Sequence, residues 1–128
     1  MSIGVKEQVH AQFKAFTGTA TTDEAVDDVF AQVEKFVGER QVAPKSIGVE
    51  YLEGAGRLVF TLGYRSDEPP YGVRITRQSL GKVDSLDDLS GLEHRMAAAA
   101  SGLANVICHE LFVKTDGEFV MVFMTAAA

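Results

Sequence analysis

The last third of the chain contains two consecutive runs of strand-forming residues, 106–113 and 119–124, joined by a short polar connection. That connection holds Asp116-Gly117, and Asp-Gly between two such runs is a strong hairpin signal, because a tight turn needs residues that accept positive φ. The second run is apolar at both parities: Phe119, Met121 and Phe123 alternate with Val120, Val122 and Met124. A strand with one face in water would alternate with polar residues, so we expect this strand to be covered on both faces inside a sheet.

Two segments combine a capping box with amphipathic helical spacing. The first spans residues 22–38, where Thr21 and Glu24 have capping-box spacing; the second follows Ser90 and Glu93. The apolar stripes are Val26, Val29, Phe30, Val33, Phe36 and Val37 in the first segment, and Leu92, Met96, Ala99, Ala100 and Leu103 in the second. A stripe of six large side chains is too costly to leave in water, so we expect the helix over 22–38 to pack on a sheet.

The N-terminal half contains one further helical pattern and three alternating ones. Val5, Val9, Phe13 and Phe16 recur at helical spacing and predict a short helix over residues 4–16. Residues 46–52, 57–65 and 71–79 alternate apolar with polar side chains, which predicts three antiparallel strands with one apolar face.

These elements predict an α+β fold in a single domain, residues 1–128, with the order α-α-β-β-β-α-β-β. We expect a five-stranded, mainly antiparallel sheet with the helices packed mainly on one face. The predicted strand order is 1-2-3-5-4, because the last strand can then fill a gap left by the crossover before it. The order α-β-β-β-α-β-β is similar in outline to the folds of secretion chaperones, without the closing helix of that family; the likeness covers topology alone and no motif.

Composition narrows the functional classes. The chain has 128 residues with 46% hydrophobic and 23% charged side chains, which supports a folded core. Its net charge of −6 argues against broad nucleic-acid binding, which needs a basic stripe. The single Cys108 forbids an intramolecular disulfide and suits a reducing compartment. With neither a signal peptide nor a membrane span in the sequence, we expect a cytoplasmic protein.

Cys108-His109-Glu110 contains a thiol, an imidazole and a carboxylate, but strand geometry separates them, because neighbouring residues point to opposite faces. We expect neither a catalytic group nor a metal or cofactor site here. His109 has two readings: a core histidine with a satisfied partner, or a group in a pocket between the sheet and the helix over 22–38. In the second reading Tyr51 and Tyr64 are the other polar ligand-binding groups.

Three arginines fall on the predicted polar face of the sheet: Arg57, Arg65 and Arg74. Most solvated sheet faces look like this. The alternative is a patch that binds an anion or an acidic partner, where the local field matters more than net charge.

Two functions follow from these patterns. The first is an interaction or adaptor protein that forms a homodimer through its C-terminal hairpin, because the second apolar row of that hairpin needs a cover. That cover could come from the N-terminal helix or from a symmetric partner. The alternative is a small-molecule-binding protein or simple enzyme with its pocket at His109, Tyr51 and Tyr64.

Overall fold

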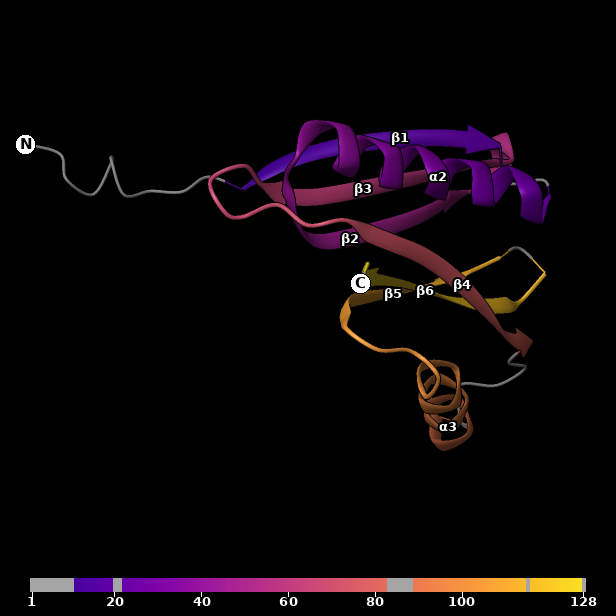
Figure 1. Cartoon of the computed structure of the whole chain (residues 1–128). Helices are drawn as coiled ribbons and strands as arrows, with labels where there is room; N and C mark the ends of the chain where they lie inside the picture. The colour runs from indigo at the N-terminus through magenta and orange to yellow at the C-terminus, as the bar shows by residue number, and fades with distance from the viewer. Residues whose placement is uncertain (1–10, 20–21, 83–88, 115, 128) are drawn as a thin grey trace, which may run out of the picture.

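The computed structural model describes residues 11–19, 22–82, 89–114 and 116–127. Within them, two α-helices and two three-stranded antiparallel sheets form the molecule (Figure 1). Sheet A consists of β1 (Gln12–Thr19), β2 (Ala43–Leu52) and β3 (Arg57–Arg65), in the order β1-β3-β2. Sheet B consists of β4 (Val73–Lys82), β5 (Val106–Val113) and β6 (Glu118–Ala126), in the order β4-β6-β5. The helices are α2 (Asp23–Arg40) and α3 (Leu89–Ala100), and the short 3-10 helix η1 (Glu53–Ala55) connects β2 to β3. Ser90 lies inside α3, so the prediction that it caps this helix is wrong.

The α+β class is confirmed, whereas the single five-stranded sheet is wrong. Strands β3 and β4 do not pair, so the chain forms two sheets instead of one. The last three strands do lie in the predicted relative order, with β6 between β4 and β5. The extra strand is β1, which occupies part of the segment predicted as a helix over 4–16; residues 4–10 lie outside the described part of the chain.

Pairing with β3 explains why residues 12–16 are a strand. Phe13 and Phe16 have helical spacing, but the strand continues through Thr17 and Thr19, which are β-branched and favour extended backbone. All eight residues of β1 pair in register with β3, from Gln12 opposite Tyr64 to Thr19 opposite Arg57. Tertiary pairing therefore overrides a weak local helical pattern.

Helix α2 confirms the strongest helical prediction and is fixed at both ends. Its N-cap is Thr22, whose hydroxyl oxygen accepts a hydrogen bond from the Ala25 N–H at 3.1 Å. The predicted capping box began one residue earlier, at Thr21, which lies outside the described residues. The helix continues past Gly38 and ends where Gln41 adopts the left-handed conformation, with φ of 55°, and donates its N–H to the Val37 carbonyl. Five residues of its apolar stripe are buried: Val26, Val29, Phe30, Val33 and Val37.

The main core lies between α2 and the inner faces of both sheets. Leu58, Phe60 and Leu62 of β3 are completely buried there, as are Val122 and Met124 of β6. The rings of Phe30 and Phe60 meet edge to face with centroids 5.8 Å apart. Helix α2 contacts both outer strands, β1 and β4, so it spans the concave side that the two sheets enclose.

A second, smaller core lies on the other side of sheet B. Here Leu80, Met121 and Phe123 are buried beneath α3, against the half-buried side chains of Leu92 and Met96. Both rows of β6 are therefore covered, as predicted, and both covers come from the same chain. The two helices lie on opposite faces of sheet B, so the prediction that helices pack mainly on one face is wrong.

The two sheets repeat one topology. Each is built from a continuous β-α-β-β segment in which the first strand pairs with the third and the third with the second. The matching edge strands β2 and β5 lie against each other where the halves meet. The Cys108 thiol is hydrogen-bonded there to the backbone of Ile47. The two helices of the repeat differ in burial, since five residues of α2 are buried and none of α3 is.

Candidate functional site

The residues predicted to form a pocket are not brought together. His109 lies opposite Phe123 on the outer face of sheet B and is exposed, which excludes both predicted interior positions. Tyr51 and Tyr64 are half-buried at the two ends of the β2–β3 hairpin, where Tyr51 pairs with Leu58 and Tyr64 pairs with Pro44. The predicted pocket space between α2 and sheet A is instead filled by buried side chains, among them Val29, Val33, Leu58, Phe60 and Leu62.

Cys108 is a poor nucleophile in this position. Its side chain is half-buried against the main core, and burial raises the pKa of the thiol to about 11. At neutral pH the group is therefore the protonated thiol, and the thiolate is the reactive form. His109 points to the other face of β5, as the sequence predicted.

The three arginines are also separated. Arg57 and Arg65 are the first and last residues of β3, about 26 Å apart at about 3.3 Å per residue, and Arg74 lies in sheet B. Arg65 already has local partners, since its Nε lies 3.1 Å from Asp67 Oδ1 and 3.7 Å from Glu68 Oε2. The hydrogen bond to Asp67 raises the pKa of the guanidinium. The structure thus shows a paired surface arginine here instead of a shared anion patch.

An ion-pair network that the sequence did not reveal joins the start of α2 to sheet B. Arg77 of β4 contacts Asp27 at 2.8 Å and Asp23 at 3.7 Å, while Lys114 contacts Asp23 at 3.8 Å and Glu118 at 2.9 Å. The Ser79 hydroxyl donates to Glu118, and this bond, with that from Lys114, lowers the pKa of Glu118.

A cavity of about 120 Å³ lies beside this network, with Val26, Phe112 and Val120 on its apolar side. Both cations of the network are neutralised by neighbouring carboxylates. We therefore assign the network to fastening α2 onto sheet B.

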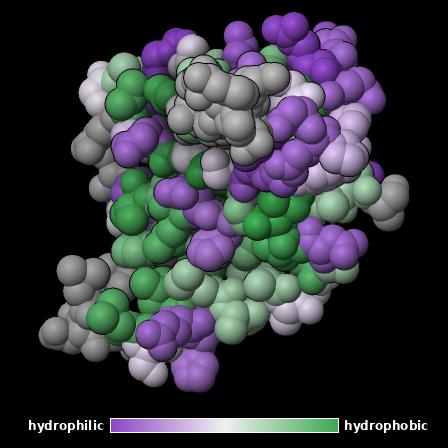
Figure 2. Space-filling model, turned by 90° about the vertical axis from the view of Figure 1, so that its left-hand side faces the viewer, coloured by the Kyte–Doolittle hydropathy of each residue, from purple (hydrophilic) through white to green (hydrophobic). Residues whose placement is uncertain are grey.

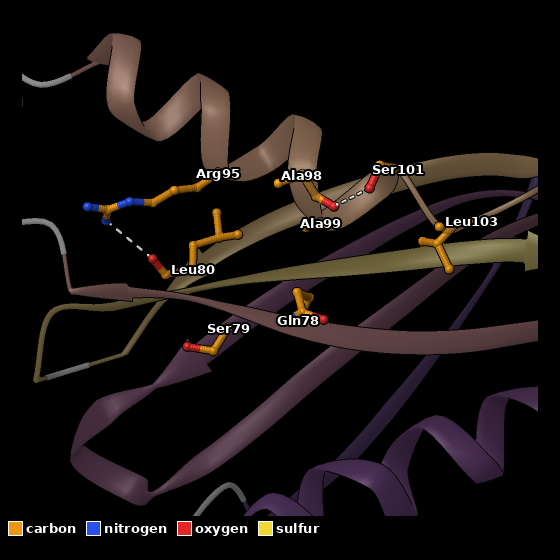
Figure 3. Close-up of a pocket in the computed structure, with 9 residues that line it drawn as sticks. Gln78, Ser79, Leu80, Arg95, Ala98, Ala99, Ser101 and Leu103 are labelled. Carbon is orange, nitrogen blue, oxygen red and sulfur yellow. Dashed lines mark hydrogen bonds between the residues drawn. The ribbon is translucent and has the colours of Figure 1, made fainter.

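A larger groove lies between the C-terminal half of α3 and β4 (Figure 3). Its volume is about 600 Å³, and its lining residues are Gln78, Ser79, Leu80, Arg95, Ala98, Ala99, Ser101, Gly102 and Leu103. Arg95 stands at one end, where its Nη1 donates to the carbonyl oxygens of Leu80 at 3.2 Å and Lys82 at 3.4 Å. Figure 2 shows that hydrophilic side chains predominate over sheet A and α2, whereas apolar ones gather across the region of sheet B and α3.

The four outer edges of the two sheets differ in how they are covered. Those of β2 and β5 lie against each other. The edge of β4 is covered by α2, where the Ile75 N–H donates to Glu34 Oε2 at 2.8 Å. For β1, no described residue outside β3 hydrogen-bonds to the strand backbone. Figure 1 shows β1 along the upper margin of the molecule.

Phe13 marks the open strand. Its side chain is 72% exposed, although it is a large aromatic group. It lies on the outer face of sheet A, against Gly63 of β3, where an added Cβ would come within 3.3 Å of the ring. The ring therefore lies beside the backbone edge of β1 that has no strand partner among the described residues.

Compared with protein-family models, curated proteins and solved structures, the chain has no significant match. Across the described residues, no helix is long and apolar enough to cross a membrane. The same residues contain no group of three or more His, Cys, Asp or Glu side chains placed to hold a metal ion. The candidate sites are therefore the groove beside α3 and the open edge of β1.

Proposed function

We propose that the protein is an interaction protein that forms a homodimer through antiparallel pairing of β1 with β1 of a second copy. The observation that carries the proposal is the difference between the four sheet edges. The edges of β2 and β5 face each other, and the edge of β4 is hydrogen-bonded to α2 at Ile75. Helix α2 also packs against β1, but no described residue hydrogen-bonds to the outer backbone edge of that strand. An uncovered edge presents a row of backbone donors and acceptors, which another strand can satisfy.

The sequence of β1 suits strand addition. The strand is regular over eight residues and contains no proline, and its register with β3 has no bulge. Its only charged side chain is Lys14. Proline, bulges and charges are the devices by which soluble proteins usually block edge strands, so β1 is weakly defended against pairing.

A second copy is a suitable partner because an antiparallel pair of identical strands is self-complementary under two-fold symmetry. In the register that places Ala15 opposite Ala15, each Phe13 ring lies opposite Thr17 of the other copy, on the same outer face. Each Lys14 then faces Phe16 of the other copy, so the like charges do not meet directly. Sheet A would extend through the axis into a six-stranded sheet.

This proposal keeps the predicted homodimer but moves its interface. The hairpin interface rested on the idea that the second row of β6 needs a cover from outside. The structure supplies that cover from within the chain, by α2 and sheet A on one side and α3 on the other. The small-molecule pocket under α2 is not proposed, because buried side chains occupy that space.

The test is a charge swap at Ala15, which is exposed on the outer face of β1. Light scattering across the micromolar range should show a dimer for the wild type and monomers for Ala15→Lys and for Ala15→Glu. A mixture of the two variants should form a dimer again, because opposite charges then face each other across the axis. The matched control is Leu52→Lys, which adds the same charge at an exposed apolar residue of β2, away from the β1 edge. It should remain dimeric.

Thermal unfolding of each variant shows whether the fold is intact. A wild-type protein that stays monomeric at every concentration would overturn the proposal. So would a folded Ala15→Lys variant that dimerises as well as the wild type.

A further inference from the structure

We propose that the groove between α3 and β4 binds a small amphiphilic carboxylate, with its apolar body over Leu80 and Leu103 and its carboxylate at Arg95. This site is separate from β1 and does not depend on the proposed homodimer. Three observations support the proposed ligand site: the shape of the groove, its charge, and the way α3 packs on sheet B.

The groove has an apolar floor that reaches into the second core. Leu80 is only 7% exposed and belongs to that core, together with Met121 and Phe123. Ala98, Ala99 and Leu103 form the helix side of the floor. A volume of about 600 Å³ falls within the range of roughly 300–1,000 Å³ that is typical of small-molecule sites.

The attachment of α3 explains why an opening exists there. Helix α3 has no buried residue, whereas α2 has five. The alanines at 97–100 present short side chains, so the helix cannot fill the space above β4 by itself. A bound apolar molecule would remove exposed surface of Leu103 and Ala98 from water.

The charge of the groove selects the polar end of the ligand. Among the nine described residues that line the groove there is one cation, Arg95, and no acidic side chain. Two carbonyl oxygens hold the Nη1 end of the guanidinium, and within the described residues they are the only acceptors of Arg95. The remaining N–H donors can take a carboxylate, for which the planar guanidinium is well shaped. The net charge of −6 repels anions elsewhere, so any anion preference has to come from this local cation.

One further polar group can contribute to selectivity. The Ser79 and Ser101 hydroxyls are already engaged with Glu118 and with the Ala98 carbonyl. The exposed Gln78 amide makes no hydrogen bond to a described residue, so it can accept or donate to a hydroxyl or amide on the ligand. A ligand with a carboxylate at one end and a second polar group along its body would use both residues.

The test uses three probes that differ only in the head group: octanoate, octanol and octylamine. Two-dimensional ¹H–¹⁵N NMR titrations below the micellar range should show octanoate shifting the amides of residues 78–80 and 95–103. The dissociation constant should be about millimolar, since ligand efficiency is modest for a probe of this size. Octanol should bind more weakly, and octylamine should not bind measurably.

Two variants locate the site. Arg95→Gln should weaken octanoate binding about tenfold, because a charge-assisted hydrogen bond is lost, and should leave octanol binding unchanged. Ala98→Phe should block all three probes by filling the groove. Its control is Ala97→Phe on the same helix, since Ala97 is exposed and does not line the groove; it should bind octanoate as the wild type does.

Equal binding of the three probes would overturn the proposal, and so would unchanged octanoate affinity in folded Arg95→Gln. Because Arg95 also ties α3 to β4, Ala98→Phe provides the independent test if Arg95→Gln fails to fold. If octanoate fails to bind while Ala98→Phe changes the oligomeric state, the groove is a protein interface and the ligand proposal is wrong. None of these results alters the outcome of the Ala15 charge swap.

Discussion

The backbone N–H of Ile75 on β4 donates to the Glu34 carboxylate on α2 at a distance of 2.8 Å. A helix side chain thus takes the place that the carbonyl of a neighbouring strand would occupy inside a sheet. Two turns closer to the start of α2, Asp27 binds Arg77 of the same strand through two hydrogen bonds. The helix therefore closes the outer edge of sheet B with hydrogen bonds and charge, while its apolar stripe fills the core.

Replacing Glu34 tests this closure. Glu34→Ala should lower the free energy of unfolding by about 1–3 kcal/mol, because it leaves the Ile75 N–H without its charged acceptor. The Ile75 amide should also exchange with solvent faster. Glu39→Ala is the matched control: Glu39 is exposed on the same helix and has no partner among the described residues, so urea unfolding should show little change. Equal effects of the two substitutions would contradict the assignment.

Substitutions at the adjacent residues Asp27 and Asp28 distinguish the contribution of the Asp27–Arg77 ion pair to stability from the general effect of a negative charge near the start of α2. Asp27→Asn should destabilise the protein by about 0.5–1 kcal/mol, since the pair with Arg77 is well formed but partly exposed. Asp28→Asn removes the same charge from an exposed residue that has no partner among the described residues, and should change stability less. The difference between the variants should shrink at high salt in denaturant titrations. A difference that is zero at low salt would show that the pair contributes nothing.

Gly18 allows α2 to approach β1. An added Cβ would lie 2.6 Å from Cγ2 of Val29, a completely buried side chain that cannot move freely. Gly18→Ala should therefore destabilise the protein by about 1–3 kcal/mol through overpacking. Gly38→Ala is the comparison, because nothing lies within 4 Å of the added Cβ there. In α2 that substitution should raise stability by about 0.5–1 kcal/mol. Melting temperatures that move in the same direction for both variants would refute this account.

The lowered pKa of Glu118 predicts that its contribution to the free energy of unfolding depends on pH. Hydrogen bonds from Ser79 and then Lys114 lower its pKa in the folded protein, so the carboxylate contributes stability above the ordinary glutamate pKa. That contribution should disappear as the pH falls through the lower, folded-state value. The stability difference between the wild type and Glu118→Gln should thus be present at neutral pH and disappear once the pH falls below the folded-state pKa, as measured by urea unfolding across a pH series. A difference that is unchanged between these conditions would show that Glu118 titrates normally.

Helix α3 should open before the rest of the fold. It buries no residue completely, whereas five residues of α2 lie in the main core. Local unfolding free energies follow buried contacts, so amide hydrogens of residues 92–100 should exchange much faster than those of residues 29–37. Exchange measured by mass spectrometry on peptides from the two helices gives the comparison. Similar protection of both helices would mean that α3 opens only with the whole domain.

Sequence patterns predicted the parts of the fold where local and tertiary preferences agree. The helix over 22–38, the strand over 57–65 and the C-terminal hairpin all appear in the structure, because their apolar periodicity matches the surfaces they bury. The doubly apolar strand 119–124 correctly predicted that β6 lies inside a sheet. The helix predicted over residues 4–16 was wrong at residues 12–16, because two phenylalanines at helical spacing cannot reveal a strand partner about 45 residues away in the sequence.

The candidate sites were less predictable than the fold. His109 has the parity that the sequence predicted, but α3 packs on the β4 side of the sheet, and His109 on the opposite edge strand, β5, remains exposed. The groove depends on how loosely α3 lies on β4, and the open edge of β1 depends on where α2 and β5 cover the other edges. Neither property is encoded in a short motif. The capping and turn residues of the individual elements could not have indicated them.

The repeated β-α-β-β arrangement has a consequence for synthesis on the ribosome. Every strand pair of sheet A forms within residues 12–65, and every pair of sheet B within residues 73–126, so no ladder crosses the connection between them. A nascent chain can complete its first sheet while β4 is still untranslated, since domains and their parts emerge N-terminal end first. Glu34 is then left facing solvent until Ile75 arrives. Sheet B, in contrast, is completed only when β6, the last of its strands to be synthesised, pairs between β4 and β5.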